Sequence, residues 1–159
     1  GFATIADIKA IESEMPWEQR DVPATMHGLL ARARDNYGSG NAISYQMFSD
    51  PGAKAETLTW DETYARCVQA ANLFRSLGIG ENDTVAYVLP NCTETVVTLL
   101  GAMMAGKAAP INPLLDAEHI AGILRETDAK GLVTLKAFPR PMSHRRPPAP
   151  SNWRPTSSM

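Results

Sequence analysis

The chain has 159 residues, of which 44% are hydrophobic and 20% are charged, and its formal net charge is -2. This length and composition favour one soluble globular domain or part of a larger one. The small net charge gives no reason to expect a nucleic-acid partner or attraction to an anionic membrane surface.

Cysteine usage and the apolar runs predict a cytoplasmic protein. Cys67 and Cys92 stand apart without a CxxC spacing, so we expect free thiols rather than a disulfide or a zinc site. The first residues lack the basic and apolar regions of a secretory signal. The longest apolar stretch, residues 96–111, is too short for a transmembrane helix and includes Lys107 and Pro110.

Two helices and a hairpin are predicted before residue 60. Residues 4–15 place isoleucines at helical spacing before a stop at Pro16, which indicates a short amphipathic helix. Thr25 is a good N-cap for a second helix that ends near Gly38. Residues 42–48 alternate as a strand does, residues 49–52 have turn chemistry, and residues 56–59 read as the returning strand.

The clearest local signal is the run from Thr59 to Glu62, which is a capping box. In such a box the Thr hydroxyl and the Glu carboxylate each accept a hydrogen bond from an otherwise unpaired backbone N–H. A helix should therefore begin here, and Gly78 followed by Ile79 should end it with a left-handed cap. Its predicted apolar face is Tyr64, Cys67, Val68, Ala71, Phe74 and Leu77.

Residues 84–135 predict a βαβαβ order. Residues 84–89 read as a strand buried on both faces, Thr93 as the cap of an apolar core helix, residues 107–111 as a second strand, Asp116 as the cap of another helix, and residues 131–135 as a third strand. The fold class is therefore α/β, a partial doubly wound parallel sheet preceded by helices and a β-hairpin. Ligands in such sheets bind beyond the carboxyl ends of the strands, here near 90–91 and 112–113.

The order of these signals resembles the adenylate-forming acyl-CoA synthetase family, also called the AMP-binding family. The resemblance covers about residues 24–136 and rests on the strings Leu58-Thr59-Trp60, Leu77-Gly78-Ile79, Asp83-Thr84-Val85-Ala86, Leu89-Pro90-Asn91-Cys92-Thr93-Glu94, Gly106 and Ile111-Asn112-Pro113. It implies the opening of the family's large N-terminal domain. Members of the family activate a carboxylic acid with ATP to an acyl adenylate and transfer the acyl group to coenzyme A.

The resemblance implies ATP, Mg²⁺ and coenzyme A for a full-length relative, with a fatty or aryl acid as substrate. The family's phosphate loop, its nucleotide contacts and its catalytic Lys lie further along the chain and have no counterpart here. We therefore expect no catalytic, cofactor-binding or metal-binding residue in this chain, no cofactor for the fragment itself, and no catalytic activity.

Several other candidates favour structural roles. Residues 37–41 contain two glycines but precede a strand and lack a Lys, so they read as a turn rather than a phosphate cradle. His119 lies in a first helical turn beside Asp116, where capping explains both residues. His27 and His144 show no partner in sequence, and residues 103–104, both Met, read as core filling. Asn91 and Asn112 suit turns as well as a pocket.

From residue 137 the composition changes. Residues 137–159 hold four Arg, no acidic residue and six of the twelve prolines, without apolar periodicity. Reading the segment one base out of frame permits an Ala-rich amphipathic helix, so we predict a frameshift, with a natural basic tail as the alternative. The predicted division is 1–23 as an N-terminal helix and linker, 24–136 as a partial synthetase-type domain, and 137–159 as a non-native tail.

A second hypothesis is a complete, small α/β binding or interaction module with a basic Pro-rich tail. The sheet edge distinguishes the two hypotheses. A fragment should leave an unpaired parallel strand and an uncovered apolar face, whereas a module should have a partner chain there.

Overall fold

The computed structural model describes residues 4–47, 50 and 52–136. Its elements are α1 (Ile5–Glu14), the short 3₁₀ helix η1 (Trp17–Gln19), α2 (Met26–Tyr37), β1 (Asn41–Tyr45), β2 (Glu56–Thr59), α3 (Trp60–Ser76), β3 (Thr84–Val88), α4 (Thr93–Ala105), β4 (Lys107–Ile111), α5 (Ala117–Glu126) and β5 (Ala129–Thr134). The predicted tail, His144 and the last residue of the first predicted strand lie outside the described residues. No helix in the described part is both long and apolar enough to span a bilayer.

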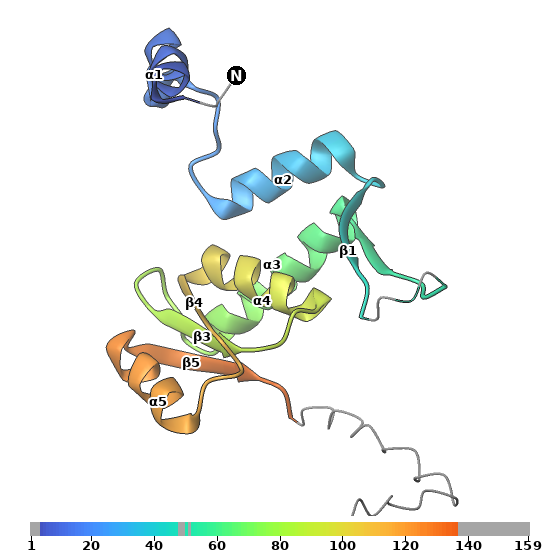
Figure 1. The fold of residues 1–159 in the computed structure, drawn as a ribbon, viewed down its shortest axis with the longest axis vertical. Helices are drawn as coiled ribbons and strands as arrows, with labels where there is room; N and C mark the ends of the chain where they lie inside the picture. Colours follow the sequence, from blue (N-terminus) through green and yellow to red (C-terminus); the bar gives the residue numbers. More distant parts are fainter. Residues whose placement is uncertain (1–3, 48–49, 51, 137–159) are drawn as a thin grey trace, which may run out of the picture.

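The centre of the fold is a parallel sheet with the strand order β4-β3-β5. Val85 of β3 pairs with Ala108 of β4 on one side and with Gly131 of β5 on the other. Helices α3 and α4 cover one face of this sheet and α5 covers the opposite face (Figure 1). The predicted α/β class, with helices on both faces of a parallel sheet, is confirmed.

All five residues of β3 are buried, which explains why its sequence is nearly continuous in apolar and β-branched residues. Alternate side chains enter two different cores. Val85 packs with Phe74 of α3 and Ala102 of α4, whereas Ala86 and Val88 face the side covered by α5. The central strand therefore joins the two layers.

The predicted caps of α3 are present at both ends. The hydroxyl of Thr59 accepts a hydrogen bond from the Glu62 N–H at 3.2 Å, and the Glu62 carboxylate accepts one from the Thr59 N–H at 2.9 Å. At the other end Gly78 has a φ of 85°, and the Ile79 N–H donates to the Phe74 carbonyl at 3.0 Å. This is a Schellman cap, with Phe74 and Ile79 in the same core.

Replacing Thr59 with Ala should destabilise the protein by about 1 kcal/mol, because the Glu62 N–H loses the hydroxyl oxygen that accepts its hydrogen bond and the Glu62 carboxylate loses the hydrogen bond from that hydroxyl. The hydrogen bonds from Thr59 also lower the pKa of Glu62. Because folding lowers this pKa, the ionised Glu62 carboxylate stabilises the folded protein at pH values above the pKa of the unfolded chain. This stability is lost as the pH falls through the pKa of the folded protein. Urea unfolding at neutral pH and near pH 3 should therefore show a smaller difference between Thr59→Ala and wild type at the lower pH. An equal difference at both values would contradict the contribution of the hydrogen bond from the Thr59 hydroxyl to the Glu62 carboxylate.

Three sequence predictions fail in detail on α3 and α4. Leu77 was placed on the apolar face, yet it is 69% exposed, because it lies at the C-cap where the chain leaves the helix. Thr93 was expected to cap α4, but Cys92 takes the extended N-cap backbone and Thr93 becomes the first helical residue. Met103, expected in the core, is 44% exposed, whereas Ala102 and Ala105 of the same helix pack in the core with α3 and the sheet and Met104 packs against that core.

The remaining elements lie outside the sheet layers. Strands β1 and β2 form the predicted antiparallel hairpin, with Ser44 opposite Thr57. Helix α2 follows its Thr25 cap as expected and packs against α3. The amphipathic helix α1 forms with a capping box between Thr4 and Asp7, but none of its residues is buried.

Candidate functional site

The carboxyl edge of the sheet was the predicted place for a site. The chain runs from β3 to β4 on one side of the sheet and then to β5 on the other, so the point where the winding reverses lies between β3 and β5. Residues 89–91 after β3 lie there, together with residues 135–136 after β5. Asn112 follows β4, on the other side of β3. Sequence reasoning missed the end of β5 because strand order cannot be read from spacing.

Asn112 serves its own turn. Its side-chain oxygen accepts a hydrogen bond from the Leu114 N–H at 3.0 Å, and its backbone carbonyl accepts one from the Leu115 N–H at 3.2 Å. Asn residues often hold turns in this way. The turn interpretation of Asn112 therefore accounts for its oxygen atoms.

Asn91 borders a small cavity of about 160 Å³ between β1 and the start of α4. Its lining residues are Ile43, Ser44, Tyr45, Asn91, Cys92, Thr95 and Val96. The Thr95 hydroxyl donates to the Pro90 carbonyl and lies 3.2 Å from the Cys92 sulfur, so this hydroxyl is already engaged. The cavity offers shape and neutral polar atoms but no carboxylate or histidine for proton transfer.

The glycine-bearing turn at 37–41 does not have the form of a phosphate cradle. The Gly38 N–H donates to the Arg34 carbonyl at 2.8 Å, and the Gly40 N–H donates to the Tyr37 carbonyl at 2.6 Å. The carbonyls of the same two glycines accept from the first N–H groups of α3, at Asp61 and Trp60. Phosphate binding needs free N–H groups at a helix start, and these groups are used within the chain.

The histidines of the described chain have local partners. His119 Nδ1 lies 2.8 Å from the Asp116 carboxylate, which also accepts the His119 N–H, and these hydrogen bonds lower the pKa of Asp116. His27 Nε2 lies 3.0 Å from the Tyr64 hydroxyl. The Arg34 guanidinium stands 4.4 Å from the centre of the same Tyr64 ring, so this cluster joins α2 to α3.

The described residues do not fit a site for Mg²⁺ or nucleotide phosphates. Between residues 4 and 136, excluding 48, 49 and 51, no group of three or more His, Cys, Asp or Glu side chains could hold a metal ion. In the turn at 37–41, the N–H groups of both glycines donate to carbonyls of the chain itself. No catalytic step is therefore assigned to these residues.

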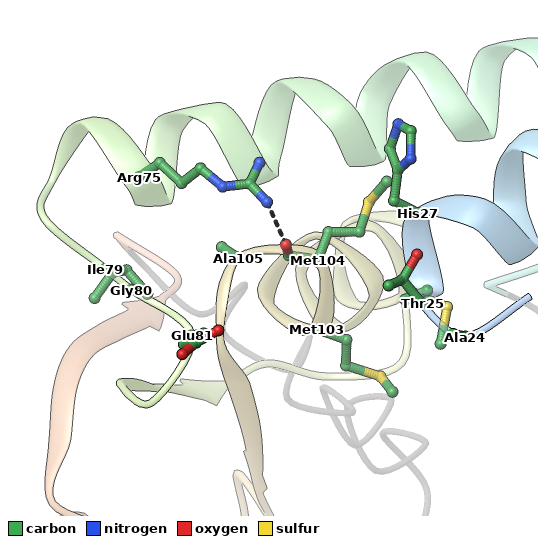
Figure 2. A pocket seen from close by; sticks show the side chains of 11 residues that line it. Ala24, Thr25, His27, Arg75, Ile79, Gly80, Glu81, Met103, Met104 and Ala105 are labelled. Atoms are coloured by element: carbon green, nitrogen blue, oxygen red, sulfur yellow. Dashed lines mark hydrogen bonds between the residues drawn. The ribbon is translucent and has the colours of Figure 1, made fainter.

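A larger cavity of about 750 Å³ lies at the opposite, amino edge of the sheet (Figure 2). The start of α2, the end of α3, the loop before β3 and the end of α4 form its walls. The charged groups among its lining residues are Arg75 and Glu81, and its apolar lining residues include Met26, Met103 and Met104. The Arg75 guanidinium donates a hydrogen bond to the Met104 carbonyl, so it is held at the wall of the cavity (Figure 2).

Near this amino edge, Lys130 connects β5 to the loop that precedes β3. Its ammonium group donates to the Asp83 carboxylate at 2.8 Å and to the Gly78 carbonyl at 2.7 Å. The Asp83 carboxylate also accepts the Gly80 N–H at 2.7 Å. The hydrogen bond from Lys130 is the first cause of the lowered pKa of Asp83 and the Gly80 N–H is the second.

Changing Lys130 to Met should raise the pKa of Asp83 toward the ordinary aspartate value. The wild-type chain should lose the stability conferred by this carboxylate as the pH falls below about 4, and Lys130→Met should lose less over the same range. NMR titration of the Asp83 carboxyl carbon measures this directly. Lys107→Met is the matched control, since Lys107 acts only weakly through its charge and should shift the pKa less. An equal shift in both variants would contradict the assignment.

The chain has relatives among known proteins. The family model described as "AMP-binding enzyme" matches residues 31–155. The chain is 38% identical over 137 residues to marinolic acid--CoA ligase of Pseudoalteromonas sp. (strain SANK 73390), which covers 86% of this chain and 21% of that protein. It is 34% identical over 122 residues to the peroxisomal benzoate--CoA ligase of Arabidopsis thaliana, covering 76% of this chain and 20% of the relative.

Solved structures agree on the fold. The N-terminal domain of FACL13 from Mycobacterium tuberculosis matches with a TM-score of 0.62 at 23% identity, covering 70% of this chain and 27% of that one. An anthranilate CoA ligase, AuaEII, matches with a TM-score of 0.61 at 21% identity, covering 72% of this chain and 21% of the other. The chain spans about a fifth of the length of the curated relatives it matches.

Proposed function

The chain belongs to the AMP-binding enzyme family, and on that premise we propose that it carries the opening part of the large domain of an ATP-dependent acyl-CoA ligase. In the proposed reaction a carboxylate attacks the α-phosphorus of ATP, forming an acyl adenylate and releasing pyrophosphate. The thiol of coenzyme A then attacks the acyl carbon, forming the thioester and releasing AMP. ATP, Mg²⁺ and coenzyme A belong to this reaction in the whole protein.

The observation that carries the proposal is the family match over residues 31–155. The names of the relatives support a carboxylic acid as substrate, since they include benzoate, trans-cinnamate and butyrate ligases. We propose the fatty or aryl acid class without choosing between them. The described residues supply a scaffold, namely the first strands of a parallel sheet and the helices that cover it.

We expect the 159-residue chain alone to form no acyl adenylate and no thioester. The activity test uses the longer protein encoded at the same locus, incubated with ATP, Mg²⁺, coenzyme A and a panel of fatty and aryl acids. The expected result is acid-dependent release of AMP, with pyrophosphate still released when coenzyme A is omitted. The 159-residue chain at the same concentration is the matched control. A folded long protein that activates no acid of either class would contradict the ligase proposal.

The composition change at residue 137 supports a frameshift in the coding sequence. The family match runs to residue 155 and so includes much of the Pro-rich segment 137–159. The DNA sequence distinguishes a frameshift from a natural basic tail. Sequencing through the codons for residues 138–140 should show a missing base, and its restoration should open a frame with a phosphate loop and a late Lys. A confirmed present frame would favour the binding-module hypothesis.

The binding-module hypothesis predicts a partner at the edge of the sheet. Within the described residues β5 pairs only with β3, and Leu132 of β5 is 49% exposed. In the ligase hypothesis later strands of the whole protein would pair with this edge, so the 159-residue fragment leaves it open, whereas in the module hypothesis another chain covers it. A cytoplasmic location stays a prediction, and several plant relatives have peroxisomal names.

A further inference from the structure

Helix α1 presents an apolar stripe that the rest of the described chain does not cover. Ile5, Ile8 and Met15 are 73%, 46% and 43% exposed. Figure 1 shows α1 standing apart from the layers that contain the sheet. An amphipathic helix with an exposed apolar side gains stability when that side is buried against a partner surface.

Contacts of the linker hold α1 in this position. The Arg20 guanidinium, which is half-buried, donates to the Ile11 carbonyl at 2.7 Å near the end of α1. The Arg32 guanidinium of α2 donates to the Asp21 carbonyl and lies 3.6 Å from the Asp21 carboxylate. The linker is therefore attached to both helices, and α1 is directed away from the body of its own chain.

The cavity at the amino edge has the chemistry to accept such a helix. We define it as the Met103 groove, bounded by the start of α2, Arg75 of α3, Glu81 and the end of α4. Met103 is 44% exposed although it lies on a largely apolar helix. Methionine side chains adapt to the irregular surface of a docked apolar helix, which is why they are common at such surfaces.

Charges on the two surfaces are complementary. Glu12 lies one turn after Ile8 on the apolar side of α1, so docking of this side brings a carboxylate toward the groove. The groove has Arg75 in its wall. Lys9 lies at the edge of the apolar stripe of α1, and its charge is opposite to that of Glu81 in the groove.

We propose that the Met103 groove binds α1 of a second copy of the chain, and that the exchange is reciprocal. Each α1 then covers the groove of the other copy, as in a two-fold symmetric dimer. A helix of ten residues is only about 15 Å long. Two contacts of this length are small, and weak, transient interfaces in general bury less than about 1,200 Å² in total, so we expect a weak, concentration-dependent dimer.

Sedimentation equilibrium of the 159-residue chain tests this proposal. The weight-average mass should rise toward that of a dimer as concentration increases. Ile8→Glu and Met103→Glu should each weaken association at least tenfold, because each places a charge in the apolar contact. Both positions are exposed in the single chain, so helix content measured by circular dichroism should stay unchanged. Ala10→Glu, at an exposed position on the opposite side of α1, is the matched control and should still dimerise.

A charge exchange between α1 and the groove distinguishes loss of the contact from loss of folding, because a misfolded variant would not recover association when a second charge is changed. Glu12→Arg and Arg75→Glu should each weaken the dimer, and the double variant should recover most of the wild-type association. A chain that stays monomeric at all concentrations overturns the proposal, including the case in which α1 docks onto its own groove. Dimerisation that is unaffected by Ile8→Glu and Met103→Glu also overturns it, because the interface then lies elsewhere.

Discussion

Replacing Phe74 with Ala is expected to lower the free energy of unfolding by about 3–5 kcal/mol. Phe74 is 7% exposed and packs with Val85 of β3 and Ala102 of α4, so its removal leaves a cavity where α3, α4 and the sheet meet. Its backbone carbonyl also accepts the hydrogen bond of the Schellman cap, and its side chain packs in the same core as Ile79. Urea unfolding followed by circular dichroism gives the value from the shift in midpoint.

The adjacent residue supplies the matched control for this prediction. Leu73 is also a large apolar residue of α3, but it is 56% exposed. Leu73→Ala should therefore cost less than about 1 kcal/mol, as is usual for surface substitutions. Similar losses for Phe74→Ala and Leu73→Ala would mean that α3 is rotated relative to the packing described above. A loss for Phe74→Ala below about 1 kcal/mol would contradict the core assignment.

The second large effect is expected from Gly106→Ala, which should destabilise the protein by about 3 kcal/mol. Gly106 lies between α4 and β4, where its own N–H donates to the Ala102 carbonyl at 2.7 Å. A Cβ atom there would lie 2.5 Å from the carbonyl oxygens of both Gly80 and Asp83. Because both obstacles are backbone atoms, neither can move aside by changing a rotamer, and the loop before β3 must shift.

Gly122→Ala is the matched control for this substitution. Gly122 lies within α5, and an added Cβ would meet no atom within 4 Å. Ala has a higher helix propensity than Gly, so this variant should be more stable than wild type by up to about 1 kcal/mol. Thermal and urea unfolding of both variants should thus give changes of opposite sign. Destabilisation of equal size in the two variants would show that close packing at Gly106 is not the cause.

Elements whose signals are local could be predicted from the sequence. The capping box of Thr59 and Glu62 and the left-handed Gly78 mark both ends of α3, because cap geometry depends on a few neighbouring residues. The alternation of strands and helices after residue 84 predicted the parallel sheet, because this order along the chain is typical of parallel strands joined by helices. The cap of α4 was placed one residue late, since Cys92 and Thr93 both precede an apolar run and tertiary packing decides which one takes the extended backbone.

The candidate site could be predicted only as far as the carboxyl edge of the sheet. The nominated Asn91 does border a cavity there, but Asn112 holds its own turn and lies after a different strand. The large cavity at the amino edge gave no sequence signal, because its walls come from the start of α2 and the distant ends of α3 and α4. Arg75, Glu81 and Met103 are unremarkable in sequence, and only packing brings them together.

The order of the elements, the caps of α3 and the family resemblance could be read from the amino-acid sequence, because each depends on neighbouring residues or on their spacing along the chain. The strand order β4-β3-β5, and therefore the set of strand ends that meet at the carboxyl edge, follows only from the packing of the folded chain. It also decided that α1 stays uncovered while Met103 faces a groove. Strand order and helix exposure depend on contacts between residues far apart in sequence, and periodicity carries no information about such contacts.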